Sequence, residues 1–313
     1  MEHWDNIIIG AGPAGLSAAL YMARFRRRVL VIHDGKARAL RIPDTHNAPG
    51  FPDGVSGVEL ITRMTSHAVE FGAVPAEAEI VATKRDGDLF RLTSEDGSTW
   101  TTRSLILATG IVLHEVEMDR AAHEAAIAAG ILRYCPICDG YEHIDKAIGV
   151  IGSDTQGAAE ALFLRRYSAN ITLVPNNFAD LTPTELQAMR EAGIKVIEQP
   201  LERLDPLSDR MNVYVAGEAL PLSFDVIYPA LGSHPRNELA LSLGLKATDG
   251  GEVAMNAAFS KLVDGVFAAG DIVEGLDQIS VAMGHGAVAA TKAHNWLRER
   301  DGNVLEASVE ANR

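Results

Sequence analysis

The sequence predicts an α/β fold of two Rossmann-like domains, each a three-layer (ββα) arrangement around a parallel sheet. Three observations carry this prediction. An apolar strand, a glycine-containing turn and a helix follow one another in residues 6–33, and the same order returns in residues 148–175. Two more apolar strands lie in residues 104–110 and 265–271. Short β-branched runs of this kind are typical of strands that are buried on both faces of a sheet.

Length, charge and cysteine content narrow the class of protein. The chain has 313 residues, which is enough for two domains. Its formal net charge of −14 argues against general nucleic-acid binding, because phosphate contacts need an excess of Lys and Arg. Two cysteines are too few for a secreted disulfide framework. With neither a basic leader nor an unbroken apolar span of about 20 residues, we expect no membrane association and a reducing, cytoplasmic setting.

The first strand, Asn6–Ile9, leads directly into Gly10-Ala11-Gly12-Pro13-Ala14-Gly15, and a helix follows from Leu16. This is the G-x-G-x-x-G pattern in the strand–turn–helix context that dinucleotide binding requires. Gly10 is expected to make the tight turn, Gly12 to let backbone approach a pyrophosphate, and Gly15 to allow close helix packing. The free N–H groups at the start of the helix would then bind the phosphates.

The residues that follow later strands bear on which dinucleotide is bound. His33 stands where an acidic residue usually binds the adenosine ribose, and Asp34 is next to it, so either could take that role. The glycines alone do not separate FAD from NAD. Asp271 stands at the end of the apolar strand in residues 265–271. Its carboxylate suits a hydrogen bond to a polyhydroxyl chain such as the ribitol of FAD, although a helix cap is the alternative. The strand that ends in Ala108-Thr109-Gly110 is the second feature of this kind.

The two cysteines form the motif Cys135-Pro136-Ile137-Cys138. Two intervening residues let both sulfurs close a small ring at the start of a helix, where the positive end of the dipole lowers a thiol pKa. A zinc site would need a second ligand pair, and His143 is the one nearby nitrogen ligand, so we favour a redox dithiol and expect no metal. Asp139 can serve as proton donor and acceptor for the thiols, or can cap or charge-stabilise the following turn.

In their joint order and spacing, the motifs of this chain resemble those of the low-molecular-weight thioredoxin reductase family over nearly the full length. The motifs that carry the resemblance are Gly10-Ala11-Gly12-Pro13-Ala14-Gly15, Asn47-Ala48-Pro49-Gly50-Phe51-Pro52, Ala108-Thr109-Gly110, Cys135-Pro136-Ile137-Cys138-Asp139-Gly140, Gly232-Ser233-His234-Pro235-Arg236-Asn237, Gly270-Asp271-Ile272 and Asp277-Gln278-Ile279-Ser280.

The resemblance implies a homodimeric flavoprotein with a discontinuous FAD-binding domain, residues 1–113 and 242–313, and an inserted NAD(P)-type domain, residues 114–241, that carries the CxxC motif. The chain would cross between domains near residues 111–114 and 234–237. The implied FAD contacts, together with those from the strand ends, are Gly10, Gly12, Pro13, Ala14, Gly15, His33, Asp34, Asn47, Ala108, Thr109, Gly110, Asp271, Gln278, Ile279 and Ser280. The Gly-Gly-Gln usual in the family after the second strand is absent, and Lys36 and Arg38 are candidates for the missing phosphate or ribose contacts.

The same resemblance assigns roles to the cysteines. Cys138 would receive electrons from the flavin, and Cys135 would attack an outside disulfide. The implied activity is that of an FAD-dependent disulfide oxidoreductase acting on a thioredoxin-like protein or a small disulfide or dithiol.

The second glycine turn, Gly152-Ser153-Asp154, departs from the family pattern because Asp154 replaces a glycine beside the pyrophosphate of NADPH. Two unit charges about 5 Å apart repel by about 3 kcal/mol at an effective dielectric of 20, which is roughly a hundredfold in affinity. After the next strand, Pro175-Asn176-Asn177-Phe178 replaces the cationic cluster that binds the 2′-phosphate. We therefore predict that NADPH is not the electron donor.

This departure resembles the branch of the family that lacks NADPH-binding motifs and takes electrons from ferredoxin or another low-potential donor. The basic run Arg24-Phe25-Arg26-Arg27-Arg28 could bind an acidic donor, or could be a solvated helix end.

Three other functions stay open at this point. One is an FAD-dependent dithiol oxidase that passes electrons to oxygen and shares a proline at the position of Pro136. The second is an NADPH-dependent thioredoxin reductase, and the third is a non-catalytic flavin-binding redox sensor. Outside the sites, Phe259, Phe267 and Trp296 are expected in the core.

Overall fold

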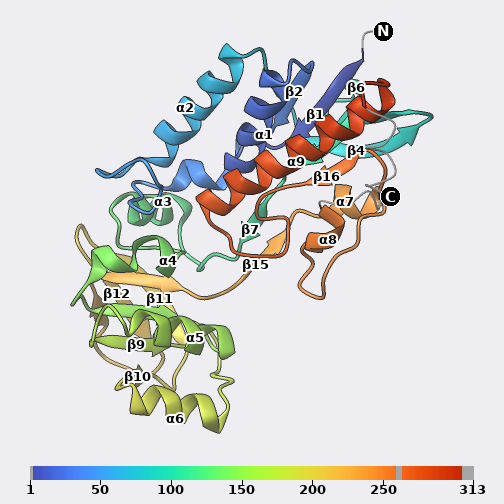
Figure 1. Ribbon diagram of the computed structural model, residues 1–313. Helices are drawn as coiled ribbons and strands as arrows, with labels where there is room; N and C mark the ends of the chain where they lie inside the picture. The colour runs from blue at the N-terminus through green and yellow to red at the C-terminus, as the bar shows by residue number, and fades with distance from the viewer. Residues whose placement is uncertain (1–2, 259–262, 305–313) are drawn as a thin grey trace. The chain divides into compact units, whose positions relative to one another are not determined.

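The computed structural model describes residues 3–258 and 263–304 (Figure 1). The chain divides into two compact units. The larger unit comprises Met1–Leu40, Ser56–Val112 and His234–Arg313, and the smaller unit comprises Arg41–Val55 and Leu113–Ser233. The mixed α/β architecture predicted from the sequence is confirmed, with a mixed, mainly parallel sheet in the larger unit and a parallel sheet in the smaller one.

The larger unit is built on a seven-stranded sheet of order β3-β2-β1-β6-β5-β4, with β16 paired to β6. Strands β3, β2, β1, β6 and β16 are parallel, and β4 and β5 extend β6 as an antiparallel meander. The isoleucines of β1 are buried on both faces, as the sequence pattern predicts. The strands are β1 (Trp4–Ile9), β2 (Val29–His33), β3 (Val74–Glu77), β4 (Ile80–Asp86), β5 (Leu89–Ser94), β6 (Thr99–Leu107) and β16 (Val266–Ala268).

Helices α1 (Pro13–Arg24) and α9 (Ile279–Arg300) pack against each other through small residues. A Cβ atom on Gly286 of α9 would lie 2.2 Å from the carbonyl oxygen of Ala14, so glycine is needed for this close approach. Phe267 and Trp296 are buried as predicted, whereas Phe259 lies outside the described residues. The other helical segments of this unit are η1 (Arg38–Arg41), α2 (Gly57–Glu70), α7 (Glu238–Ser242) and α8 (Met255–Ala258).

The smaller unit has a parallel sheet of order β10-β9-β8-β14 and an antiparallel sheet of order β11-β12-β13. Apolar residues of both sheets, among them Val174, Met211 and Ile227, share one buried cluster. The strands are β8 (Ile148–Ile151), β9 (Ile171–Val174), β10 (Lys195–Val196), β11 (Leu201–Pro206), β12 (Met211–Val215), β13 (Leu222–Phe224) and β14 (Val226–Pro229). The helices are α3 (Arg120–Ala128), α4 (Pro136–Asp139), η2 (Gly140–His143), α5 (Thr155–Leu164) and α6 (Pro183–Glu191).

The chain passes between the units in β7 (Ile111–Leu113) and β15 (Ser233–Pro235), which pair with each other in the stretches where the sequence predicts crossovers. Apart from a shift of one residue at Leu113, the unit boundaries differ from the predicted domains in two places. The second boundary follows Ser233 and not residue 241, because Ala240 of α7 is buried in a core cluster with Ile7 of β1. Residues 41–55 group with the smaller unit, where Asn47 bonds to the carbonyl of Ile137.

Among the residues that the structure describes, no helix combines the length and apolar character needed to cross a bilayer.

Candidate functional site

Three loops of the larger unit meet where strands β1, β6 and β16 end, since these strands are neighbours and run in parallel. Gly10 follows β1 with φ +109°, a conformation that L side chains rarely adopt. A Cβ atom there would lie 2.2 Å from the Ala108 carbonyl oxygen, and one on Gly15 would lie 1.9 Å from the Gly10 carbonyl oxygen. Both glycines therefore have the geometry that the sequence motif predicts.

Gly12 is the N-cap residue of α1, and Pro13 is its first helical residue. A Cβ atom on Gly12 would have no heavy atom within 4 Å, and no side chain caps the first turn of the helix. The backbone N–H groups of Ala14 and Gly15 thus lie at an uncapped helix N-terminus beside open space. This cradle fits the pyrophosphate of a dinucleotide.

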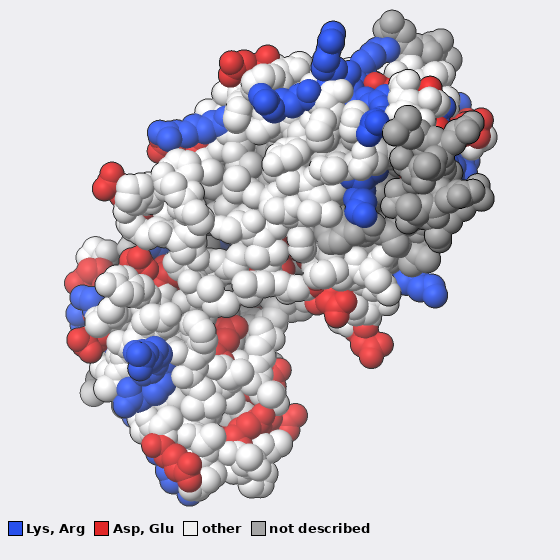
Figure 2. Space-filling model, in the orientation of Figure 1, with Lys and Arg blue, Asp and Glu red and all other residues white. Residues whose placement is uncertain are grey.

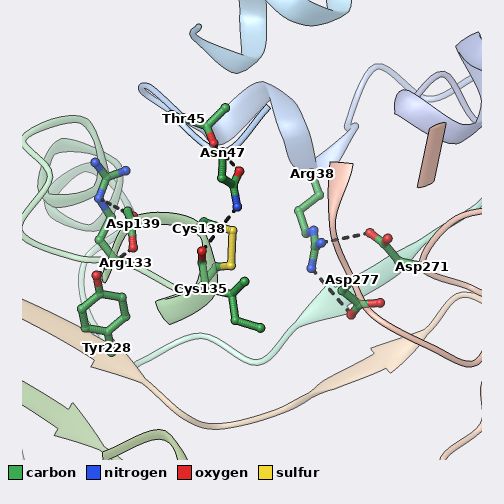
Figure 3. The surroundings of a disulfide bond; sticks show 11 residues. Arg38, Thr45, Asn47, Arg133, Cys135, Cys138, Asp139, Tyr228, Asp271 and Asp277 are labelled. Atoms are coloured by element: carbon green, nitrogen blue, oxygen red, sulfur yellow. Dashed lines mark hydrogen bonds and ion pairs between the residues drawn. A yellow bond between two sulfur atoms is a disulfide. The ribbon is translucent and has the colours of Figure 1, made fainter. Parts of the chain in front are cut away.

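Asp271 lies next to this loop, because Gly270 approaches the first turn of α1 so closely that its Cβ would be 2.7 Å from the Ala14 Cβ atom. Its carboxylate is 3.0 Å from the Arg38 guanidinium, which also lies 3.9 Å from Asp277 (Figure 3). Burial raises the pKa of Asp271, while Arg38 lowers it. Burial and then Asp271 raise the pKa of Asp277 to about 6, against the opposing effect of Arg38. A half-buried carboxylate here fits the predicted bond to a ribitol hydroxyl, with Arg38 orienting it.

Other residues predicted to bind FAD are tied together at the same sheet edge. Asp34 accepts from Arg236 Nη1 at 3.2 Å, and the Thr109 hydroxyl donates to the Arg236 carbonyl oxygen at 2.6 Å. Lys36 forms an exposed ion pair with Glu79 at 3.5 Å. Arg236 is a site residue that sequence reasoning missed, although it stands within one of the family-like motifs.

His33 also lines a small apolar recess beside the glycine loop. Its backbone neighbour Gly35 donates to His33 Nδ1 at 3.2 Å, which fixes the ring at the end of β2. The recess is lined by Ala11, Leu16, Val31, His33, Thr65, Ala68, Val69, Ala73 and Pro75.

The last predicted FAD contacts in the sequence are Gln278, Ile279 and Ser280. Gln278 is the N-cap residue of α9, and Ile279 and Ser280 begin that helix. As in α1, no side chain caps the first turn. The two uncapped helix N-termini and Asp271 belong to the same unit.

In the smaller unit, Cys135 and Cys138 are joined by a disulfide bond (Figure 3). Cys135 is the N-cap residue of α4, which begins at Pro136, and the Cys138 N–H donates to the Cys135 carbonyl oxygen at 3.0 Å. The pair thus closes a ring over one helical turn, as the CxxC spacing predicts. Among the described residues, no group of three or more His, Cys, Asp or Glu side chains is placed to hold a metal ion.

Asp139 is 8% exposed, and both of its carboxylate oxygens are engaged. Tyr228 donates a hydrogen bond of 2.7 Å to Oδ1, and Arg133 Nε lies 3.1 Å from Oδ2 (Figure 3). Burial raises the pKa of Asp139, while Arg133 and then Tyr228 lower it. The carboxylate does not cap the following turn η2. The capping role is therefore not observed, whereas the acid–base role stays a prediction, and neither partner was foreseen from the sequence.

Asn47 lies against the same disulfide turn. Its side-chain amide donates to the Ile137 carbonyl oxygen at 3.4 Å and accepts from the Thr45 hydroxyl at 2.9 Å (Figure 3). The contact holds the loop of residues 41–55 on the backbone between the two cysteines. The predicted FAD contact of Asn47 stays a prediction.

The second glycine turn, between β8 and α5, is closed by its own side chains. Asp154 is the N-cap residue of α5, and its Oδ1 accepts from the N–H groups of Gln156 at 3.0 Å and Gly157 at 3.3 Å. A carboxylate of the protein thus takes the N–H donors that a pyrophosphate would need. A second carboxylate, Glu185 of α6, bonds to the Thr155 hydroxyl, which lowers the Glu185 pKa.

The loop after β9 is tied to the same turn. The Ser153 hydroxyl donates to Asn176 Oδ1 at 2.6 Å and accepts from the Asn177 N–H at 3.0 Å. Residues 175–180 contain no Lys or Arg, so this loop offers no cation to a 2′-phosphate.

The basic run of residues 24–28 is largely engaged within the larger unit. Arg27 pairs with Asp301 at 2.6 Å, while Arg24 and Arg28 lie over the rings of Phe71 and Trp4. Figure 2 shows Lys and Arg in small separate groups on the visible face. These contacts favour the structural interpretation of the run over an open docking surface.

Comparisons with known proteins agree with this geometry. The pyridine nucleotide-disulphide oxidoreductase family matches residues 4–286. A thioredoxin reductase of Streptomyces clavuligerus is 31% identical over 93% of both chains. The solved structure of HlmI is 27% identical, with a TM-score of 0.87 over 99% of this chain and 96% of that one. The atypical thioredoxin reductase TRi of Desulfovibrio vulgaris Hildenborough is 30% identical over 95% of this chain and 98% of that one, with a TM-score of 0.53.

Proposed function

The chain belongs to the thioredoxin reductase family of pyridine nucleotide-disulphide oxidoreductases, and we propose that it is an FAD-dependent disulfide oxidoreductase that works without NADPH. Electrons would pass between FAD and the Cys135–Cys138 pair, and between that pair and a thioredoxin-like protein or a small disulfide. The observation that carries the proposal is the disulfide at the start of α4, followed directly by the buried carboxyl group of Asp139. The names of the relatives support a thioredoxin-like partner.

The larger unit offers what FAD requires. The glycine loop and the start of α1 would hold the pyrophosphate, and Asp271 would hold the ribitol chain. Bound FAD would supply the two-electron chemistry. The homodimer and the cytoplasmic location are part of the same proposal, and analytical ultracentrifugation tests the first of these.

The smaller unit offers what thiol–disulfide exchange requires. A thiolate at the start of a helix is stabilised by the N–H groups of the first turn, and exchange then proceeds through a mixed disulfide. Asp139 follows Cys138 directly and would give a proton to the leaving thiolate. Burial raises the pKa of this carboxyl group, which favours that task.

NADPH independence is proposed because the residues that would bind the pyrophosphate and those that would bind the 2′-phosphate of NADPH are both replaced. The Asp154 carboxylate occupies the backbone donors at the start of α5, and the loop after β9 carries asparagines bonded to Ser153. A nucleotide would have to displace a cap that contributes about 0.5–2 kcal/mol and to bind beside its charge. Ferredoxin or another low-potential donor would supply the electrons instead.

The dithiol oxidase is the second candidate, since the same closed turn also suits an enzyme that gains electrons from its substrate dithiol. Air-saturated assays with small dithiols separate the two. Stoichiometric hydrogen peroxide, with a matching loss of substrate thiols, supports the oxidase, whereas turnover of a disulfide under argon with a reduced donor supports the reductase.

Gly12→Asp is expected to weaken FAD binding by about a hundredfold, because it places in the first turn the carboxylate that the second turn already has. The site has room for the side chain, so the variant should fold. Gly12→Ala is the matched control for added bulk without charge: its Cβ also enters the cradle, so it should lose some flavin, but less than Gly12→Asp. Heat-released FAD per chain, measured by chromatography and absorbance, is the readout. Full flavin occupancy in Gly12→Asp at submicromolar protein would contradict the assignment of this loop to the pyrophosphate.

A further inference from the structure

Two residues, Arg133 and Tyr228, each contact one oxygen of the buried Asp139 carboxyl group. We call this pair of contacts the clamp. Arg133 is six positions upstream, before the CxxC motif, and Tyr228 lies 89 positions downstream in β14. Tyr228 is fully buried, so its hydroxyl reaches Asp139 from the core of the smaller unit. Figure 3 shows the guanidinium and the phenol on the two oxygens of the one carboxyl group.

Both partners have fixed protonation states at neutral pH. Burial and the Asp139 charge raise the pKa of Tyr228, so the phenol stays a hydrogen-bond donor. Arg133 is a permanent cation. A buried carboxyl group that bonds one donor and one cation has its proton affinity set by them, because each stabilises the ionised form.

The other charged and titratable groups near Asp139 come from η2. Glu142 raises the pKa of Asp139, in opposition to Arg133. His143 stacks edge-to-face on the Tyr228 ring, with centroids 5.9 Å apart. Burial, then Arg133 and Lys146, lower the pKa of His143 to about 4, so it is neutral near pH 7 and adds no charge. Arg133 is therefore the cation that opposes burial at this carboxyl group within the described structure.

We propose that Arg133 and Tyr228 are positioning residues that orient the Asp139 carboxyl group and control its proton exchange with the dithiol. The proposal rests on the proposed function, in which Asp139 serves the Cys135–Cys138 pair. Neither residue needs to touch the substrate, because each acts through Asp139.

The exchange can be written with every electron and proton placed. The Cys135 thiolate attacks one sulfur of the substrate disulfide, the S–S bond breaks, and the leaving thiolate takes the proton of Asp139. Cys138 then gives its proton to the Asp139 carboxylate and attacks the Cys135 sulfur. The protein disulfide forms, and the second substrate thiolate leaves and takes a proton from water. The dithiol loses two electrons and the substrate disulfide gains them.

The direction in which the pKa of Asp139 should change in the variants follows from the two contacts of the clamp. Arg133 and Tyr228 lower the pKa of Asp139, so removing either one raises it further. As a proton donor Asp139 is active below its pKa, and the rate falls as the pH rises through that value. The limb of the pH–rate profile that belongs to Asp139 should therefore move to higher pH by about 1–2 units in Arg133→Met and by about one unit in Tyr228→Phe.

The test uses the full-length flavoprotein, reduced with dithiothreitol, desalted under argon and mixed with a disulfide in a single turnover. Two disulfides are compared. Bis(2-hydroxyethyl) disulfide has a poor leaving group that needs a proton, whereas 5,5′-dithiobis(2-nitrobenzoate) releases a stable thiolate that does not. Rates are measured across the pH range for Arg133→Met, Arg133→Lys, Tyr228→Phe, Asp139→Asn and the control Tyr134→Phe. Tyr134 is half-buried and also carries a hydroxyl beside the motif, but that hydroxyl bonds to His123 and Val116.

The shift of the Asp139 limb to higher pH should occur with bis(2-hydroxyethyl) disulfide and not with 5,5′-dithiobis(2-nitrobenzoate). Arg133→Lys should restore most of the wild-type pH–rate profile. Tyr134→Phe should leave the Asp139 limb at its wild-type pH. Tyr228→Phe keeps the ring and the core, so the test survives if Arg133→Met does not fold. A limb that stays in place in both variants but vanishes in Asp139→Asn would overturn the clamp and leave the proposed function intact. An unchanged profile in Asp139→Asn would instead remove the role of Asp139, and the inference with it.

Discussion

Serine at Cys135 or at Cys138 is expected to lower disulfide-exchange turnover by about a thousandfold or more. Each sulfur has a separate task, since one attacks the outside disulfide and the other resolves the mixed disulfide. A hydroxyl has nearly the same size but is a far weaker nucleophile at neutral pH. Turnover with a thioredoxin-like protein and with a small disulfide, each driven by a chemically reduced flavin, is the measurement.

The two serine variants should differ in what they accumulate. In Cys138→Ser, Cys135 can still attack, but the mixed disulfide with the substrate cannot be resolved and should be trapped. Mass spectrometry should then show the added mass of one substrate thiol per chain. With Cys135 replaced, no such adduct is expected if Cys135 is the attacking sulfur. Both variants should keep FAD, because the cysteines and the flavin loop lie in different units. Wild-type turnover in either variant would make the pair a structural disulfide, and adducts trapped in Cys135→Ser alone would reverse the two roles.

The sequence was sufficient for the features that depend on near neighbours in the chain. The turn at Gly10, the close packing at Gly15 and the disulfide within CxxC all follow from residues a few positions apart. The clamp on Asp139 does not, because Tyr228 comes from a strand that only the folded sheet brings near. The contact of Asn47 with Ile137 joins residues 90 positions apart and was missed for the same reason.

Asp154 illustrates an intermediate case. The sequence identifies the position and predicts repulsion of an anionic ligand. The structure adds a second effect, because the carboxylate turns back and caps α5 through Gln156 and Gly157. A side chain at that position could also have pointed away into solvent, and residue type alone does not decide between the two.

NADPH at millimolar concentration is expected to reduce the wild-type flavin very slowly, whereas dithionite or a reduced low-potential donor should bleach it within the mixing time. Reversal requires changes in both halves of the nucleotide site. Asp154→Gly frees the N–H groups of Gln156 and Gly157 and, by the usual Asp-to-Gly scale at an N-cap, costs a few tenths of a kcal/mol in helix stability. Asn176→Arg removes the side-chain bond to Ser153, and together with Asn177→Arg it offers two guanidinium groups to the 2′-phosphate.

The triple variant should bind NADPH at least about a hundredfold more tightly than the wild type, since removal of the charge at Asp154 alone accounts for about 3 kcal/mol. Calorimetric titration with NADPH measures this step separately from flavin reduction, so a gain in binding without a gain in bleaching would still locate the defect in the second glycine turn. Asp154→Asn is the matched control, because it removes the charge but keeps a capping side chain on the donors, and it should recover only part of the affinity. If the wild type binds NADPH at micromolar concentration and its flavin bleaches stoichiometrically within seconds, then the carboxylate cap yields readily to the nucleotide, and the protein is an NADPH-dependent member of its family.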